Sequence, residues 1–191
     1  MPNWCDTIYK CVGEKKEVKA LYDILEGLKQ SENSLIRNDF GNLWLGNLVH
    51  KLGGNWEECR CRGEIVDFNI SEDDSLIISQ YTAWCEQEGA RQLIEKNFPS
   101  IKVYFQEIEP GCGVFYSNDS TGEYFPEKYF IEDDYDQYCP TSIEEAASIV
   151  SEIVGKTISP KEGEIEKAVK EYQEQNEDNH LYFSKFEVLE N

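Results

Sequence analysis

The sequence predicts an α+β fold in which helices cover one face of an antiparallel sheet. Segments that alternate between apolar and polar residues are typical of half-buried strands, and segments with apolar residues three and four positions apart are typical of helices. Glycine, proline and short polar clusters separate these segments. The chain has 191 residues, of which 13% are aromatic. It can therefore build a hydrophobic core, and this composition excludes wholesale disorder.

The first part of the chain places helices between strands. The expected elements are a strand at 4–12, a helix at 15–28, a polar loop at 31–38, a short helix at 43–52, strands at 59–70 and 76–84, a helix at 86–97 and a strand at 101–109. β-branched and aromatic residues favour the first strand, which ends at Gly13. Val18, Leu21 and Leu25 repeat at helical spacing in the segment that follows.

Local signals set the boundaries of the later elements. Gly53-Gly54 closes the short helix, and Phe98-Pro99 stops the helix at 86–97. Val66 and Phe68 lie in an alternating segment that indicates a strand. The polar run at 71–75 then joins this strand to the next as a hairpin.

This order, βα followed by an insert at 31–58 and then ββαβ, is typical of the ferredoxin-like arrangement. We expect an antiparallel sheet with two helices on one face and a helical insert. Strand-like segments at 113–117 and 124–131 predict an extra hairpin within 112–131, joined by the turn at 118–122. The sequence thus predicts a domain over residues 1–131.

Residues 132–191 are expected to form an acidic C-terminal extension of two helices and a strand. Ser142 with Glu145, and Thr141 with Glu144, fit the capping-box pattern, and Gly155 fits a helix C-terminus. The segment Ser159-Pro160-Lys161-Glu162 predicts the start of a second helix, with proline in the first helical position. A closing strand is expected at 181–189.

The charge of the chain is strongly acidic. It has 38 Asp and Glu against 18 Lys and Arg, a net charge of −20. Residues 61–191 contain 29 acidic and 10 basic side chains, whereas residues 1–60 contain 9 and 8. Direct binding of nucleic acid needs clustered basic residues and is therefore not expected. The acidic runs, including Asp133 and Asp134, fit a solvated surface or a surface for a basic protein partner.

The cysteine and histidine patterns do not predict a metal or a cofactor. Seven cysteines are present and no leader-like segment precedes them, so we expect free thiols in a cytoplasmic protein. Cys59 and Cys61 form an isolated CxC pair, which is too unspecific to indicate a metal site. On the predicted strand both thiols would face the same side. No apolar run of about 18 residues occurs, so no membrane association is expected.

No catalytic motif stands out either. The two histidines, His50 and His180, lack a nucleophile motif nearby, and neither a P-loop nor GxGxxG occurs. Asp67 opens a segment that resembles a calcium loop, but Glu72 and Ile78 occupy the positions that need glycine and glutamate. We therefore predict that the protein is not an enzyme, with neither catalytic residues nor a metal or cofactor.

Aromatic and acidic residues supply the candidates for partner binding. Half-exposed tryptophans often anchor interfaces, although tryptophan is also an ordinary core residue. Trp44 and Trp56 flank the insert helix and could form a surface groove. The full set of candidate partner-binding residues is Trp44, Trp56, Asp67, Trp84, Asp133 and Asp134.

Several short segments together resemble one family. They are Met1-Pro2-Asn3-Trp4-Cys5, Gly63-Glu64-Ile65-Val66-Asp67, Tyr81-Thr82-Ala83-Trp84, Phe98-Pro99 and Glu107-Ile108-Glu109-Pro110-Gly111. The chain is similar in these segments to the YubB-type ferredoxin-like domain family of bacterial, phage and plasmid proteins. The resemblance implies a ferredoxin-like domain without an iron–sulfur cluster in a bacterial protein associated with mobile elements. It implies no particular activity, and it does not extend beyond residue 131.

These observations favour a non-enzymatic protein-binding module. Either the sheet face opposite the helices or the insert at 31–58 would contact the partner. One alternative is an acidic imitation of DNA that inhibits a nucleic-acid-binding protein, because most of the negative charge lies in residues 61–191. A second alternative is an enzyme whose site no motif marks.

Overall fold

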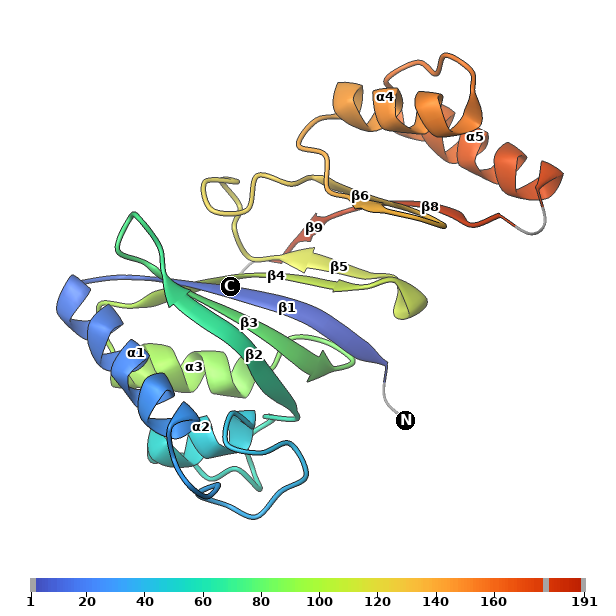
Figure 1. The fold of residues 1–191 in the computed structure, drawn as a ribbon. Coiled ribbons are helices and arrows are strands. Elements are labelled where there is room, and N and C mark those ends of the chain that lie inside the picture. Colours follow the sequence, from blue (N-terminus) through green and yellow to red (C-terminus); the bar gives the residue numbers. More distant parts are fainter. Residues whose placement is uncertain (1–2, 177–178, 190–191) are drawn as a thin grey trace. The chain divides into compact units, whose positions relative to one another are not determined.

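The computed structural model describes residues 3–176 and 179–189. It has a mixed α+β fold with mostly antiparallel strands, and the chain divides into two compact units after Asp119. Each unit has helices and strands of its own (Figure 1). The α+β prediction is therefore confirmed, and the two units are described in turn.

The first unit alternates strands and helices in the predicted order. Its elements are β1 (Trp4–Val12), α1 (Lys15–Lys29), α2 (Leu45–Lys51), β2 (Gly63–Ile70), β3 (Leu76–Ala83), α3 (Glu88–Asn97), β4 (Lys102–Glu109), the short 3₁₀ helix η1 (Pro110–Cys112) and β5 (Val114–Ser117). The strands lie in the order β2-β3-β1-β4-β5, and neighbouring strands in this order pair antiparallel. α2 is the helix expected in the insert.

The sheet of the first unit has one face against the helices and one face turned away from them (Figure 1). Successive side chains of a strand point to opposite faces. In β1, Cys5 and Tyr9 are buried on the helix-covered side, whereas Trp4 and Ile8 are exposed on the other side. We call that second side the outer face.

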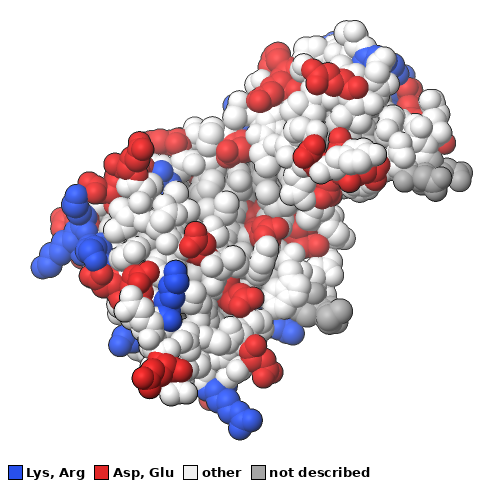
Figure 2. All heavy atoms as spheres, viewed as in Figure 1, with Lys and Arg blue, Asp and Glu red and all other residues white. Residues whose placement is uncertain are grey.

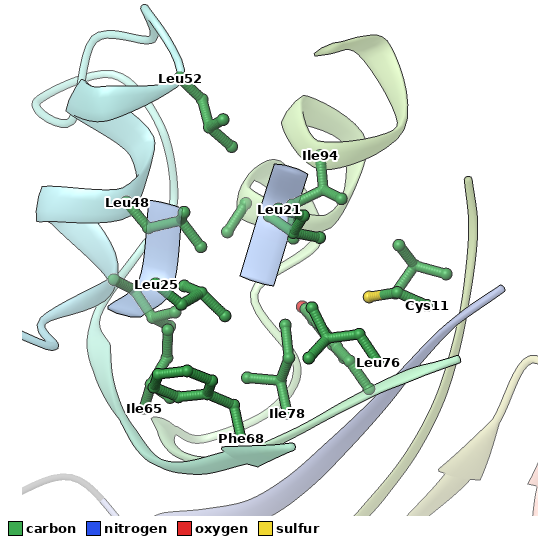
Figure 3. Packing of buried hydrophobic residues seen from close by; sticks show 14 of the residues in the cluster. Cys11, Leu21, Leu25, Leu48, Leu52, Ile65, Phe68, Leu76, Ile78 and Ile94 are labelled. Atoms are coloured by element: carbon green, nitrogen blue, oxygen red, sulfur yellow. The ribbon is translucent and has the colours of Figure 1, made fainter. Parts of the chain in front are cut away.

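A single apolar core joins the helices to this sheet. Leu21 and Leu25 of α1, Leu48 of α2 and Ile94 of α3 converge above Ile78 of β3 (Figure 3). Each of these side chains is at most 1% exposed. Full burial of one such side chain contributes about 1.5–3 kcal/mol. The spacing of leucines in α1 produces this contact, because residues four apart lie on the same side of a helix.

The second unit packs two helices on a small sheet. Its elements are β6 (Tyr129–Asp133), β7 (Gln137–Tyr138), α4 (Ile143–Val154), α5 (Glu162–Gln175), β8 (Leu181–Lys185) and β9 (Glu187–Val188). One sheet has the order β7-β6-β8. Ile131, Val150, Ile165 and Leu181 are fully buried in its core.

The predicted ends of α4 are confirmed. Ser142 is the N-cap, and its hydroxyl oxygen accepts the backbone N–H of Glu145 at 3.2 Å. The Glu145 carboxylate in turn accepts the backbone N–H of Thr141 at 2.8 Å. Gly155 ends the helix with a φ of +70°, a conformation that favours glycine.

The predicted hairpin within 112–131 does not form. β5 pairs with β4, where Phe115 lies opposite Ile108, but β6 pairs with β8, where Ile131 lies opposite Phe183. The boundary between the units therefore falls after Asp119 and not after Ile131. Alternation identifies a strand correctly, but it does not indicate which later strand completes the sheet.

Other elements also begin later than predicted. β2 begins at Gly63, so Cys59 and Cys61 lie in the loop before the strand and not on it. α3 begins at Glu88, and α5 begins at Glu162. The backbone N–H of Lys161 donates to the Ser159 carbonyl at 2.8 Å, and this turn places Pro160 before the helix and not in its first position.

Candidate functional site

A cluster of large apolar side chains lies exposed on the outer face of the first unit. Trp4 and Ile8 of β1 are 43% and 38% exposed, and Tyr81 of β3 is 45% exposed. Tyr81 lies opposite Asp6, the residue between Trp4 and Ile8 on the same face. Diagonal neighbours in a sheet are within reach of aromatic side chains, so the three residues form one surface.

Carboxylates border this surface. Tyr81 lies between Asp6 on β1 and Glu64 on β2, because it pairs with both. Asp67 pairs with Ser79, which in turn pairs with Ile8. We call this group the outer-face patch: Trp4, Asp6, Ile8, Glu64, Asp67 and Tyr81. Burial raises the pKa of the Asp6 carboxyl, as expected where a carboxylate lies against apolar side chains.

Asp67 belongs to this patch, and Trp84 directly follows β3, the strand that carries Tyr81. The irregular register between Ile65 and Asp67 marks a bulge in β2, and Asp67 is exposed on the outer face. Trp84 follows β3 directly, is 45% exposed and has a φ of +74°. A non-glycine residue in this left-handed region costs about 1–2 kcal/mol, so other contacts must hold it there. One such contact is the Trp84 backbone N–H, which donates to the Asn3 carbonyl at 3.0 Å.

Trp44 and Trp56 come together beside the insert. Their ring centroids are 5.4 Å apart, and the rings meet edge to face at 68°. They contribute to an open pocket of about 450 Å³. We call it the aromatic–arginine pocket, and its lining residues are Phe40, Trp44, Trp56, Glu57, Cys59, Arg60, Cys61 and Arg62.

One buried side chain fixes the insert that carries Phe40 and Trp44. Asn47 of α2 is fully buried, and its amide nitrogen donates to the hydroxyl of Ser34 at 2.6 Å and to the Gly41 carbonyl at 3.0 Å. Its side-chain oxygen accepts the backbone N–H of Ile36 at 3.1 Å. Because Asn47 bridges positions far apart in the loop, the loop has a defined conformation.

The cysteines at the pocket are poor nucleophiles at neutral pH. Burial raises the pKa of the Cys59 thiol, and burial together with Cys59 raises that of Cys61 to about 11. The reactive form of cysteine is the thiolate, which a raised pKa disfavours. Among the described residues, no three His, Cys, Asp or Glu side chains gather in a way that could hold a metal ion.

A buried polar network lies at one end of the helix-covered face, and the sequence patterns do not single it out. Tyr9 donates from its hydroxyl to Glu86 Oε1 at 2.5 Å, and Arg91 Nε donates to the same oxygen at 3.0 Å. Glu107 Oε2 accepts the backbone N–H of Glu86 at 2.5 Å and the thiol of Cys5 at 3.6 Å. These contacts tie the segment before α3 to β1 and β4.

Burial sets the protonation of this network. Desolvation, with the neighbouring Glu86 charge, raises the pKa of Glu107 to about 7, against the backbone hydrogen bond from Glu86, which lowers it. Burial also raises the pKa of the Cys5 thiol to about 12. The alternation of β4 could have indicated the position of Glu107, since it lies two residues beyond the buried Phe105.

Asp133 and Asp134 lie in the second unit and serve local structure. Asp133 Oδ1 accepts the backbone N–H groups of Tyr135 and Asp136, each at 2.8 Å. Asp134 Oδ1 accepts the backbone N–H of His180 at 3.0 Å. The two carboxylates therefore order the β6–β7 turn and the start of β8. They belong to a different unit from the three tryptophan candidates and Asp67.

The acidic side chains do not form one stripe on the face drawn in Figure 2, where they lie in separate groups. Several carboxylates of the second unit also contact lysines. Glu171 lies 2.9 Å from Lys156, and Glu162 lies 2.7 Å from Lys185. An imitation of duplex DNA needs a dense row of uncompensated charge, about one per 1.7 Å of axis. These pairs reduce the charge available for such a row.

Comparison with models of known protein families, with curated proteins and with solved structures gives no match to this chain. In the described part of the chain, none of the helices is long and apolar enough to cross a membrane.

Proposed function

We propose that the protein is a non-enzymatic binding module that docks a protein partner on the outer-face patch. The observation that carries the proposal is the adjacency of Trp4, Ile8 and Tyr81, three large apolar side chains that are each more than a third exposed. Contiguous exposed apolar surface rimmed by polar groups is typical of interaction sites. Tryptophan and tyrosine are also the residues most enriched at energetic centres of interfaces.

The carboxylates of the patch favour a basic partner. Asp6, Glu64 and Asp67 border the apolar side chains, and the whole chain carries a charge of −20. Complementary charge steers association and selects among partners, while the apolar centre supplies affinity. We infer that the partner presents an apolar surface surrounded by lysine or arginine.

We also propose a ferredoxin-like classification for the first unit. The order β1-α1-β2-β3-α3-β4 and the strand order β2-β3-β1-β4 support it, with α2 as the insert. The resemblance to the YubB-type family implies the same classification, and it also implies an origin in a bacterial mobile element. The fold alone does not carry the function, because one fold hosts many functions.

Affinity capture tests the docking surface. The tagged chain is compared with variants Tyr81→Ser and Ile8→Ser in the lysate of the source cells. We expect a stoichiometric partner that binds the unmodified chain and is lost, or reduced about tenfold or more, with either variant. Addition of salt should weaken the complex, because charged pairs at the rim are screened.

The control variant is Tyr22→Phe, which changes a tyrosine of α1 on the helix-covered side. It should retain the partner at the level of the unmodified chain. Recovery of the same partner by the Tyr81→Ser and Ile8→Ser variants, with both variants folded by circular dichroism, would contradict docking on this patch.

A further inference from the structure

The aromatic–arginine pocket has the properties of a small-molecule site. It adjoins the outer-face patch, because the ring of Phe40, which lines the pocket, packs edge to face on Trp4 with 6.0 Å between ring centroids. We propose that it binds a small planar aromatic molecule that carries a phosphate or carboxylate group. Its volume of about 450 Å³ lies within the range of about 300–1,000 Å³ that is usual for ligand pockets.

The aromatic part of the pocket suits a planar ring. Trp44 is 8% exposed, Trp56 is partly exposed, and both line the pocket. Phe40 adds a third ring. Stacking on an aromatic side chain contributes about 1–3 kcal/mol per ring in nucleic-acid complexes, and it accepts rings of different substitution.

Two arginines supply the charge for an anion. Arg60 and Arg62 both line the pocket and are both exposed. Neither guanidinium forms an ion pair with a carboxylate in the described part of the chain. Arg60 also interacts electrostatically with the Glu107 carboxylate and is hydrogen-bonded to the Cys85 side chain, so Arg62 is the more available of the two for an anion. Guanidinium groups bind phosphate and carboxylate with paired hydrogen bonds.

The acidic character of the chain does not prevent such binding. Charges further apart than about 8 Å are largely screened at physiological ionic strength. The lining residues include one carboxylate, that of Glu57, and two guanidinium groups, those of Arg60 and Arg62. The local charge of the pocket is therefore positive.

Buried contacts hold the arginine segment in place before a ligand arrives. The backbone N–H of Arg62 donates to Gln87 Oε1 at 2.9 Å, and Gln87 Nε2 donates to the Cys85 carbonyl at 2.7 Å. Gln87 is fully buried. On the aromatic side, a Cβ at Gly46 would lie 2.3 Å from the Trp44 ring, so glycine leaves room for that ring. Such preorganisation lowers the entropic cost of binding.

Calorimetric titration of the full chain tests the proposal. The probes are the four nucleoside monophosphates, which carry phosphate, and indole-3-acetate, which carries carboxylate. Adenosine supplies a ring without an anion, and inorganic phosphate supplies an anion without a ring. We expect at least one anionic aromatic probe to bind, and to bind about tenfold or more tightly than adenosine or phosphate. The probe that binds identifies the anionic group.

The variants Arg62→Gln and Trp56→Leu should each weaken that binding about tenfold or more. Arg37→Gln is the matched control, because Arg37 is an exposed arginine of the insert that does not line the pocket. It should leave the affinity unchanged. The proposal is overturned if none of the anionic aromatic probes binds at about 1 mM, or if binding is the same in all three folded variants.

Discussion

The side chain of Glu107 holds the backbone of Glu86. Glu107 Oε2 accepts the Glu86 N–H at 2.5 Å, and Glu107 itself is 3% exposed. Burial raises its pKa from 4.5 to about 7. The anchor of the segment before α3 therefore changes its charge near neutral pH.

The raised pKa of Glu107 predicts a specific pH dependence of stability. The folded state binds the proton more tightly than the unfolded state, so the contribution of Glu107 is complete below about pH 4.5 and is lost as the pH rises through about 7. The loss amounts to about 3 kcal/mol. In Glu107→Gln, the free energy of unfolding should therefore fall less between pH 5 and pH 8.

Urea unfolding at both pH values measures this difference. Because other carboxylates also titrate, the quantity to compare is the change in unfolding free energy from pH 5 to pH 8 in the two proteins. Equal changes in the original protein and in Glu107→Gln would contradict an elevated pKa for this group.

The hydroxyl of Tyr9 makes a second contact in the buried polar network around Glu86 and Glu107. It donates to Glu86 Oε1, and the residue is 1% exposed. Tyr9→Phe leaves a buried carboxylate with one donor fewer, which should lower the free energy of unfolding by about 1–3 kcal/mol. Tyr22→Phe is the matched control, since Tyr22 is only partly buried, and its effect should be small. Chemical denaturation of both variants gives the comparison, and equal losses would argue against the Tyr9–Glu86 contact.

The pattern of apolar residues predicts the elements of the first unit well, because each strand and helix has a clear period of its own. Short connections account for the β2–β3 and β4–β5 pairs, whereas β1 pairs with β3 and β4, which are distant in the sequence. Two features of the structure cannot be predicted from such a pattern. The pairing of β6 with β8 joins segments that α4 and α5 separate, and no local signal encodes it. The pocket cannot be predicted from this pattern either, because Arg60 and Arg62 lie in a loop and form a candidate site only together with Trp56.

The candidate residues also differ in how far the sequence predicts their positions and roles. Trp44 and Trp56 meet because both flank one short helix. The Asp133 carboxylate accepts backbone N–H groups of its own turn, and the Asp134 carboxylate accepts the backbone N–H of His180. A run of acidic residues in the sequence does not distinguish this role from a binding surface. The exposure of Trp4 and Ile8 follows from alternation, once the helix-covered side of β1 is known.

Two glycines should respond oppositely to alanine. A Cβ at Gly63 would lie 2.4 Å from the Tyr81 carbonyl oxygen in the neighbouring strand, so Gly63→Ala should lower stability by about 1–3 kcal/mol. Gly27 lies within α1 with nothing within 4 Å of a Cβ. Gly27→Ala should raise stability by about 0.5–1 kcal/mol, because alanine favours helices. Thermal unfolding measures both changes. Unchanged or increased stability in Gly63→Ala would contradict the close approach of β2 and β3.

Two serines test the start of the helices in the second unit. Ser142 caps α4, so Ser142→Ala should lower the stability of this unit by about 1 kcal/mol. Ser159 precedes α5, whose N-cap is Lys161. Ser159→Ala should therefore change stability by less than about 0.5 kcal/mol. Calorimetric melting of the two variants measures both effects; a larger loss for Ser159→Ala would place the cap of α5 at Ser159 instead.

Site-specific photo-crosslinking tests the docking surface most directly. A photoreactive phenylalanine analogue replaces Tyr81 in one preparation and Tyr22 in another, so that it stands on the outer face or on the helix-covered side. Irradiation in lysate should give a defined adduct with a basic protein from position 81 and none from position 22. If position 81 yields no adduct, or both positions yield the same one, the outer-face patch is not the docking surface.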